Sequence, residues 1–392
     1  MILNDRRRPA LPAQLLGRVF TIWLAVALLQ LATAAITGWM MPAAMTVPIW
    51  TLSTVAAMLT LGCAMLLIAR IAFRIFDEEI AGLACLACAV AVPLMAALRP
   101  GLLDSHGLQA VCMLFALNGL MARDARLGGW AIGAALGSAL ALSLDGTLLA
   151  LGFLAVVALK WLRNRAERWW LVHALLALTT TAAAILTARW AIGQPLTCGA
   201  LGVTHLLAFA WATIIMAVVA LLEPHPRAFT IGGLAAATGG VVALLAPAAP
   251  GCPAGSALGL AAVAPLWHFG AIFALQALGL PLLSFAAALR LIVPARDWLR
   301  QWWSDYAVLI LLAAIVTVFD ARVAAAACAL AAVPLGWQMR EWIRAARNSH
   351  RTGRRALALT GVALALATTR ATGPQQGQAG CQSQRPTRFP AK

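Results

Sequence analysis

The sequence predicts an all-α membrane protein that crosses the bilayer many times. Of its 392 residues, 62% are hydrophobic and only 11% are charged, whereas soluble domains carry about 25% charged residues. The mean hydropathy is +0.87, and the apolar residues fall into runs long enough to cross a bilayer as helices. Because a helix satisfies its own backbone hydrogen bonds in lipid, these runs predict a polytopic bundle of transmembrane helices.

Apolar runs recur along almost the whole chain, and no polar stretch between them is long enough to fold alone. Since a helix needs about 20 apolar residues to cross the hydrocarbon core, we expect about 12–13 spans in one transmembrane domain over residues 1–371. Residues 372–392 are polar and basic and are expected to be a disordered tail. The predicted spans are 16–37, 48–69, 80–98, 106–122, 127–144, 146–160, 170–192, 203–222, 228–247, 267–292, 306–319, 323–338 and 354–369.

Basic residues gather in every second loop, and this alternation predicts the orientation. Cytoplasmic loops retain Lys and Arg, so the N-terminus is expected in the cytoplasm and the sparsely charged loops on the outer side of a bacterial inner membrane. The net charge of +16 is then explained by loops beside anionic lipid, and we expect membrane lipid rather than nucleic acid as a partner. The basic groups are Arg6–Arg8, Arg70 and Arg74, Arg123 and Arg126, Lys160–Arg168, Arg227, Arg296 and Arg300, and Arg340–Arg355.

Small residues inside the spans predict close packing of helices. The glycine-rich run from Gly128 to Gly137 suits the approach of two helix backbones. Cys85 and Cys88 have the spacing of a redox motif, but they lie inside an apolar span and are interpreted as small core residues. Cys198 and Cys252 both fall in outer loops, where an oxidising periplasm makes them candidates for a disulfide.

Asp104 and His106 stand at the mouth of the fourth span, after a break made by Pro100 and Gly101. A carboxylate and a neutral imidazole can give two ligands to a divalent cation such as Mg²⁺ or Mn²⁺, with water or a substrate phosphate completing the shell. The alternative is a polar turn at the membrane surface in which Asp104 caps the next helix.

Two further acids fall on the outer side of the predicted topology. Asp145 lies between two strongly apolar spans, where an ionisable residue is a functional candidate, and a helix cap in a tight turn is an equal alternative. Asp320 and Arg322 are expected to form a local ion pair at a hairpin. The acids of the basic loops are interpreted as solvated charges near lipid headgroups, with Asp305 at a cytoplasmic edge.

Residues 99–109, Arg-Pro-Gly-Leu-Leu-Asp-Ser-His-Gly-Leu-Gln, resemble the arginine–proline–glycine–arginine–isoleucine–aspartate–histidine–histidine motif of a group of uncharacterised alphaproteobacterial, mainly sphingomonad-type, membrane proteins. Residues 195–201, and residues 252–256 followed by Pro265–Trp267, are similar to the same group. The motifs are short and moderately specific, and the resemblance extends from about residue 90 to about residue 290, roughly half the chain.

That group in turn resembles the GT-C class of membrane glycosyltransferases, which includes the oligosaccharyltransferase catalytic subunits and takes sugars from polyprenyl-phosphate donors at the outer face. The resemblance implies that Asp104 and His106 bind the divalent cation that neutralises the leaving pyrophosphate. It also implies that Arg99 contacts a phosphate oxygen. Asp104 and Asp145 are the two catalytic candidates, and Asp145 is included because it lies between two strongly apolar spans.

The chain departs from the family pattern in its first outer loop. Residues 37–46 contain no acid where the family has a catalytic one, and Ser105 replaces the first histidine of the motif. The leading hypothesis is therefore a GT-C-like glycosyltransferase using a polyprenyl-linked sugar, with a diverged or inactive member as one variant. The alternative is a non-enzymatic membrane protein, either a scaffold or a transporter for small solutes or lipids. A transporter needs acids or broken helices near mid-membrane, where this chain has few charges.

Overall fold

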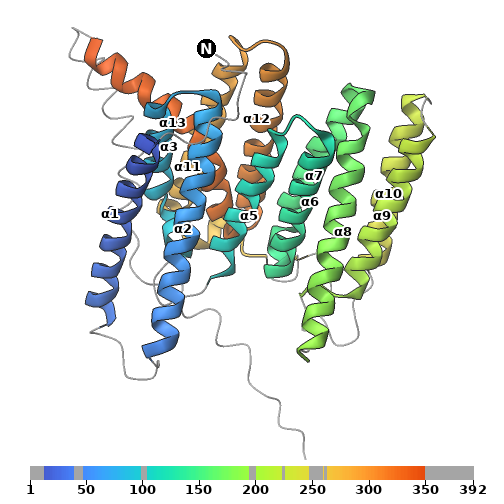
Figure 1. Ribbon diagram of the computed structural model, residues 1–392, viewed down its shortest axis with the longest axis horizontal. Coiled ribbons are helices and arrows are strands. Elements are labelled where there is room, and N and C mark those ends of the chain that lie inside the picture. The colour runs from blue at the N-terminus through green and yellow to red at the C-terminus, as the bar shows by residue number, and fades with distance from the viewer. Residues whose placement is uncertain are drawn as a thin grey trace, which may run out of the picture.

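The computed structural model describes residues 13–38, 47–98, 104–193, 200–222, 226–246, 259 and 263–348. All regular structure in these residues is helical, which confirms the predicted class (Figure 1). The α-helices are α1 (Ala13–Gly38), α2 (Val47–Ile75), α3 (Glu78–Ala89), α4 (Val92–Ala97), α5 (Ser105–Leu120), α6 (Ala125–Leu142), α7 (Thr147–Arg163), α8 (Arg168–Ala191), α9 (Val203–Leu221), α10 (Arg227–Leu245), α11 (Ala271–Ile292), α12 (Asp297–Phe319) and α13 (Ala324–Asn348). Short 3₁₀ helices are η1 (Leu144–Gly146), η2 (Arg165–Glu167), η4 (Leu266–Phe269) and η5 (Ala321–Val323).

Within the described residues, 9 helical segments are long and apolar enough to cross a membrane. Each of the first twelve predicted spans coincides with helical structure, whereas the thirteenth, 354–369, and the tail 372–392 lie outside the described residues. The third predicted span, 80–98, is not one continuous helix. It breaks into α3 and α4 just before Pro93, because proline has no N–H to continue the helical hydrogen bonds.

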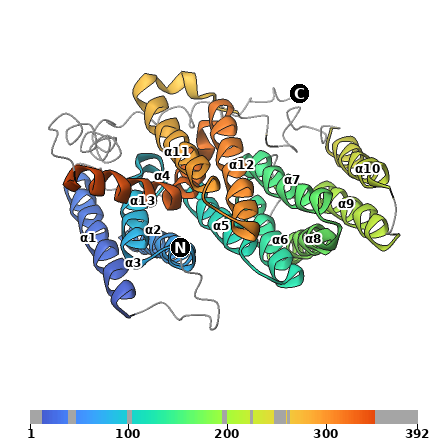
Figure 2. The same ribbon diagram turned by 90° about the horizontal axis from the view of Figure 1, so that it is seen from above.

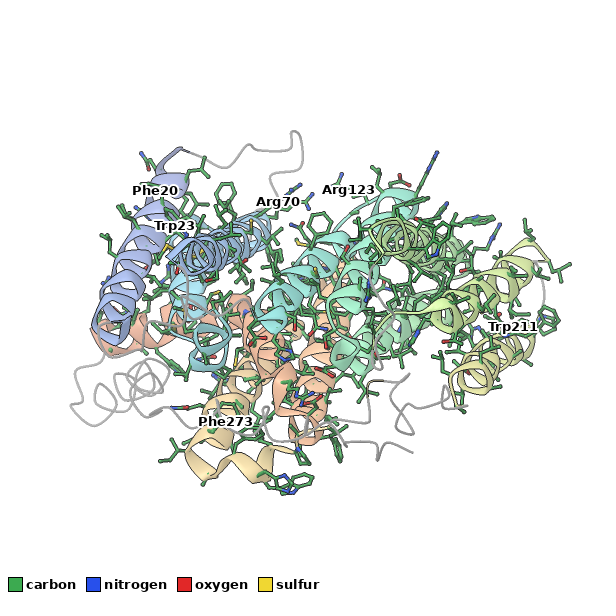
Figure 3. All side chains as sticks on the ribbon, turned by 90° about the horizontal axis from the view of Figure 1, so that it is seen from below. Phe20, Trp23, Arg70, Arg123, Trp211 and Phe273 are labelled. Carbon is green, nitrogen blue, oxygen red and sulfur yellow. The ribbon has the colours of Figure 1, made fainter. Side chains whose placement is uncertain are left out.

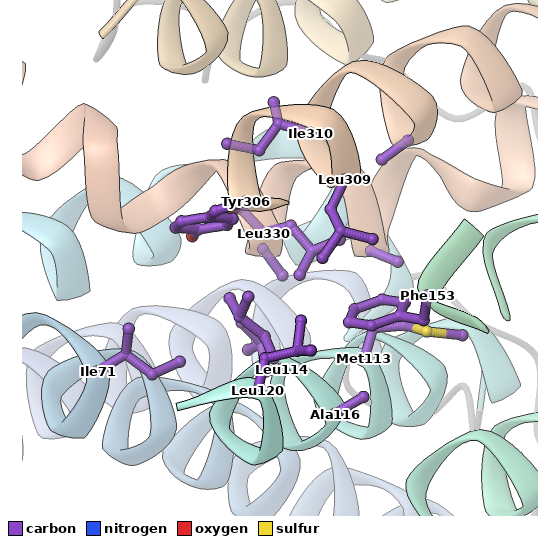
Figure 4. Packing of buried hydrophobic residues seen from close by; sticks show 14 of the residues in the cluster. Ile71, Met113, Leu114, Ala116, Leu120, Phe153, Tyr306, Leu309, Ile310 and Leu330 are labelled. Atoms are coloured by element: carbon purple, nitrogen blue, oxygen red, sulfur yellow. The ribbon is translucent and has the colours of Figure 1, made fainter. Parts of the chain in front are cut away.

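Helix α13 lies at the centre of the bundle, and 89% of its most apolar 18-residue stretch is buried within the protein. Its first half is a run of alanines, whose small side chains let neighbouring helices approach closely. Figure 4 shows the core around it, where Leu330 of α13 lies among Leu114, Phe153 and Leu309 from three other helices. The hydroxyl of Tyr306 donates a hydrogen bond to the carbonyl of Leu330, so α12 and α13 are also joined by a polar contact.

Helix α6 packs against α8 at the glycines of α6, as the run from Gly128 to Gly137 predicts. A Cβ atom added at Gly133 would lie 2.0 Å from the carbonyl oxygen of Ala174, and one at Gly129 would lie 2.7 Å from Cβ of His173. The two backbones therefore touch, and no side chain larger than hydrogen fits between them at Gly133.

The flanks of the bundle are apolar and rich in aromatic residues. Seen from below, Phe20 and Trp23 of α1 mark one flank and Trp211 of α9 marks the other (Figure 3). Helices α8, α9 and α10 extend to one side of the central helices (Figures 1 and 2). Only 17% of the most apolar 18-residue stretch of α10 is buried within the protein. Such exposed apolar surface is suited to contact with lipid.

Candidate functional site

Two short 3₁₀ turns, η1 and η5, meet at one end of the bundle and bring an acid and a base together. Asp145 lies in η1 and Arg322 in η5, and the guanidinium Nη1 of Arg322 donates to Asp145 Oδ2 at 3.3 Å. The prediction that Arg322 pairs with Asp320 is wrong, because Arg322 pairs with Asp145. The carboxylate of Asp320 instead accepts the backbone N–H of Arg322 at 3.1 Å and so begins the η5 turn.

The η1 turn is held by its own polar side chains, and Asp145 is not the capping group. The backbone N–H of Asp145 donates to Ser143 Oγ at 3.3 Å, and Thr147 Oγ1 donates to the carbonyl of Leu144 at 2.5 Å. The Asp145 carboxylate is therefore left for the ion pair with Arg322. A side chain of this kind, largely buried at a helix junction, is a functional candidate.

Asp104 caps α5, as the structural alternative expects. Its Oδ1 accepts the backbone N–H of His106 at 3.1 Å, and the imidazole Nε2 of His106 lies 3.8 Å from the same oxygen. The cap leaves Oδ2 of Asp104 without a hydrogen bond from any residue that the structure describes. His106 Nδ1 is buried and has no hydrogen-bond partner among the described residues.

Asp320 connects these two pairs electrostatically. Its side chain is only 3% exposed, and it lies between α12 and η5, outside the membrane-spanning helices. Burial raises the pKa of the Asp320 carboxyl above its usual range, and the N–H and charge of Arg322 oppose that effect. Asp145 and His106 also act on this pKa, with opposite signs. The acidic cluster is defined here as Asp104, His106, Asp145, Asp320 and Arg322.

The buried side chain of Gln109 fixes the start of α5 against the end of α6. Its amide Nε2 donates to the carbonyls of Ala139 at 3.2 Å and Ser143 at 2.7 Å. Gly146 leaves room for this amide, because a Cβ there would lie 2.7 Å from Nε2. The beginning of α5 is thereby placed beside η1, and Asp104 and Asp145 come to the same end of the bundle.

The segment before η4 packs against both turns of the acidic cluster. The N–H of Ala321 in η5 donates to the carbonyl of Ala264 at 2.8 Å. Gly259 has a positive φ of 72°, and a Cβ there would lie 2.3 Å from the carbonyl oxygen of Leu144 in η1. A residue with a side chain would be strained in this conformation and would also collide with η1.

Asp104 and His106, the two metal ligands that the sequence predicts, both lie among the described residues. No group of three or more His, Cys, Asp or Glu side chains within the described ranges is arranged to hold a metal ion. Arg99, expected to contact phosphate, lies outside the described residues, as do Cys198 and Cys252. Their expected roles stay predictions.

Asp320 and Arg322 belong to the acidic cluster, although the sequence predicts only a hairpin ion pair for them. The available signal was that Asp320 is the third acid on the predicted outer side. The sequence does not indicate that Arg322 pairs with Asp145, because the two residues are 177 positions apart along the chain.

Comparison with solved structures identifies the fold. A crystal structure of the Archaeoglobus fulgidus oligosaccharyltransferase tethered with an acceptor peptide is similar with a TM-score of 0.55 and 16% identity, over 84% of this chain and 44% of that one. The archaeal oligosaccharyltransferase AglB in complex with an inhibitory peptide and a dolichol-phosphate is similar with a TM-score of 0.53 and 16% identity, over 84% and 45%. The present chain spans less than half the length of these structures.

No protein-family model and no curated protein matches the sequence. At 16% identity, the likeness to the archaeal enzyme concerns the fold. This chain is therefore a multi-pass, all-helical membrane protein whose fold is similar to that of the membrane part of the archaeal oligosaccharyltransferase.

Proposed function

We propose that this chain is a GT-C-like glycosyltransferase that uses a polyprenyl-phosphate-linked sugar at the end of the bundle that carries the acidic cluster. The observation that carries the proposal is that Asp145, Asp320 and Arg322 lie in one cluster with His106. The similar archaeal fold, solved in complex with dolichol-phosphate, supports a polyprenyl-linked donor. The alternation of basic loops supports a bacterial inner membrane, with the N-terminus in the cytoplasm and the acidic cluster on the outer side.

Asp104 and His106 are suited to hold a divalent cation together with a substrate. Asp104 Oδ1 and His106 Nε2 lie 3.8 Å apart. Neighbouring ligand atoms of an octahedral Mg²⁺ lie about 3 Å apart, so the two side chains would have to move closer together to share one ion. Magnesium sites commonly use one or two carboxylates and complete the shell with water and substrate phosphates. A cation bound there would neutralise charge on the leaving phosphate.

Asp145 and Arg322 are the other two residues with a role in the proposed reaction. Transfer breaks the bond between the sugar C1 and the phosphate oxygen, and it forms a bond from C1 to the acceptor, which loses a proton. The carboxylate of Asp145 takes that proton, and Arg322 orients this carboxylate and attracts the donor phosphate. Asp320 adds a third carboxylate to a chain that has no acid in residues 37–46.

A transfer assay with a matched pair of cap variants tests the proposal. Asp124 caps α6 as Asp104 caps α5, with its Oδ1 accepting the Arg126 N–H at 3.1 Å, but it lies at the other end of the bundle. Asp104→Ala and Asp124→Ala should each cost about 1 kcal/mol of stability. Only Asp104→Ala should abolish transfer from a polyprenyl-phosphate sugar in the presence of Mg²⁺ or Mn²⁺.

Cation binding provides a second measurement on the same proteins. His106→Ala should weaken Mn²⁺ binding by roughly 10- to 100-fold, as the loss of a ligand or a close supporting residue does. Equal transfer by Asp104→Ala and the wild type would remove Asp104 from the chemistry. Absence of transfer in every protein, with folding intact, would favour the diverged or non-enzymatic alternative.

A further inference from the structure

The basic end of the bundle contains an open cleft of about 600 Å³, between the α7–α8 turn and the start of α12. It lies at the opposite end from the acidic cluster, so its role is independent of the proposed transferase activity. The lining residues come from the α7–α8 turn, the end of α11 and the first two turns of α12: Arg163, Asn164, Ile292, Asp297, Arg300, Gln301 and Ser304.

The lining is rich in hydrogen-bond donors that remain available. Arg300, Gln301 and Ser304 make no side-chain hydrogen bond to any residue that the structure describes. Asn164 uses its Oδ1 to accept the N–H of Ala166 at 3.1 Å, which leaves its amide NH₂ group. Guanidinium, amide and hydroxyl donors together suit an anion with several acceptor oxygens, such as a phosphate.

A buried acid holds Arg163 at the cleft. Arg163 Nη1 donates to Asp305 Oδ1 at 2.7 Å, and the Asp305 side chain is only 4% exposed. Asp305 is therefore a buried ion-pair partner, which corrects the expectation of a solvated charge. A guanidinium has five N–H donors, so Arg163 keeps others for a ligand. Asp305 is a positioning residue here, because it reaches the cleft only through Arg163.

The surroundings of the cleft are positive. Residues 160–168 and 296–305 contain six cationic side chains and three acids, Glu167, Asp297 and Asp305. One of these acids, Asp305, is already paired with Arg163. Asp297 lines the cleft and has a positive φ of 47°, a conformation that costs most residues about 1 kcal/mol or more, although Asp tolerates it better than others.

An apolar face of α11 adjoins the cleft. Ile292, the last residue of α11, lines the cleft. Leu289 of α11 and Val293, which follows the helix, are exposed, Val293 to 86%. Trp298, which is 42% exposed, directly follows the lining residue Asp297 at the start of α12. Tryptophan favours the level of the lipid headgroups, so the polar cleft and the apolar face together suit a molecule with an anionic head and acyl chains.

We propose that this cleft binds the phosphate-bearing headgroup of an anionic phospholipid, such as phosphatidylglycerol, with the acyl chains lying along the exposed face of α11. Basic pockets between transmembrane helices on the cytoplasmic side bind such headgroups by charge and hydrogen bonding. Arg163 and Arg300 contact the phosphate, and Asn164, Gln301 and Ser304 bind the remaining headgroup oxygens.

Lipid selectivity in bilayers tests this site. The full chain is placed in phosphatidylcholine vesicles containing phosphatidylglycerol with brominated acyl chains, and quenching of tryptophan fluorescence reports the lipid held at the protein. Arg300→Gln should lower the preference for phosphatidylglycerol over phosphatidylcholine about fivefold, the effect of one arginine near the surface. Arg126→Gln removes the same charge from an exposed site on α6, away from the cleft, and should leave the preference unchanged.

Trp298→Phe locates the bound lipid, since it should remove much of the selective quenching without changing any charge. Equal loss of preference in Arg300→Gln and Arg126→Gln would overturn the proposal in favour of general attraction by the basic surface. Selective quenching that persists in Trp298→Phe would place the lipid elsewhere. Displacement of phosphatidylglycerol by inorganic phosphate would show a site for the free anion and would also overturn it.

Discussion

The carboxylate of Asp145 and the guanidinium of Arg322 are 177 residues apart in the sequence and form an ion pair at 3.3 Å. Each residue sits in a 3₁₀ turn between two membrane-spanning helices. The pair therefore joins the α6–α7 junction to the α12–α13 junction, and Asp320 lies buried beside it. This contact, rather than any single motif, gathers the acidic cluster.

The Asp145–Arg322 pair should show measurable coupling in a double-mutant cycle. Asp145 is 17% exposed and Arg322 is 35% exposed, so screening by solvent limits the coupling energy to about 1 kcal/mol. Asp145→Asn, Arg322→Gln and the double variant are compared by thermal unfolding in detergent. Asp124→Asn combined with Arg322→Gln should give additive effects, because Asp124 lies at the other end. Additivity in both cycles would contradict a specific pair.

Gly133 should tolerate no larger side chain. In Gly133→Ala the new Cβ would lie 2.0 Å from the Ala174 carbonyl, which is backbone and cannot rotate away. Helices α6 and α8 must then separate, at a cost of about 1–3 kcal/mol. A Cβ at Gly239 of α10 meets nothing within 4 Å, and Gly239→Ala should be neutral or stabilising by up to about 1 kcal/mol. Similar melting temperatures for the two variants would be evidence against the observed α6–α8 contact.

Asp320 should make stability fall as the pH rises. Burial raises the pKa of this carboxyl in the folded state, so folded Asp320 keeps its proton at pH values where the unfolded residue has lost it. Unfolding then releases a proton. The contribution is fully present below the unfolded pKa of about 4 and is lost as the pH rises through the folded pKa. In Asp320→Asn this part of the pH dependence should vanish, which unfolding midpoints across the acidic range will reveal.

Removal of Arg163 should destabilise the protein through the acid that it leaves behind. Arg163→Met removes the hydrogen-bonded partner of the buried Asp305 carboxylate and leaves Lys160 as a cation near it. Because Arg163 itself is 42% exposed, we expect a loss of about 2 kcal/mol, below the range for fully buried pairs. Replacing both residues, as Arg163→Met with Asp305→Leu, should recover much of that loss. A double variant no more stable than the single one would show that the loss comes from packing of the arginine stem.

The topology is tested by reporter fusions. Fusions after Lys160 and after Arg300 should report the cytoplasm, and a fusion near Ser256 should report the periplasm, because Lys and Arg are retained in cytoplasmic loops. If all three sites report the same compartment, the orientation is wrong, and the acidic cluster loses its assignment to the outer side.

The positions of the helices are largely a local property of the sequence. Apolar runs predict twelve helical segments in the described residues, and the glycines around Gly133 predict the close contact with α8. The break before Pro93 can also be predicted from the sequence, since a proline interrupts the backbone hydrogen bonds of a helix locally. Asp104 and Asp145 were recognised individually because a carboxylate beside an apolar run is costly wherever the run packs.

What the sequence by itself determined is thus which segments form apolar helices and which acids stand at their ends, because hydropathy acts over a single helix. Only the tertiary structure decided that Arg322 pairs with Asp145 instead of Asp320, and that Asp305 is buried against Arg163. Both pairs join residues more than one hundred positions apart. Their distances depend on how α5, α7, α12 and α13 pack, and that packing is set by the shapes of many side chains together rather than by any local pattern.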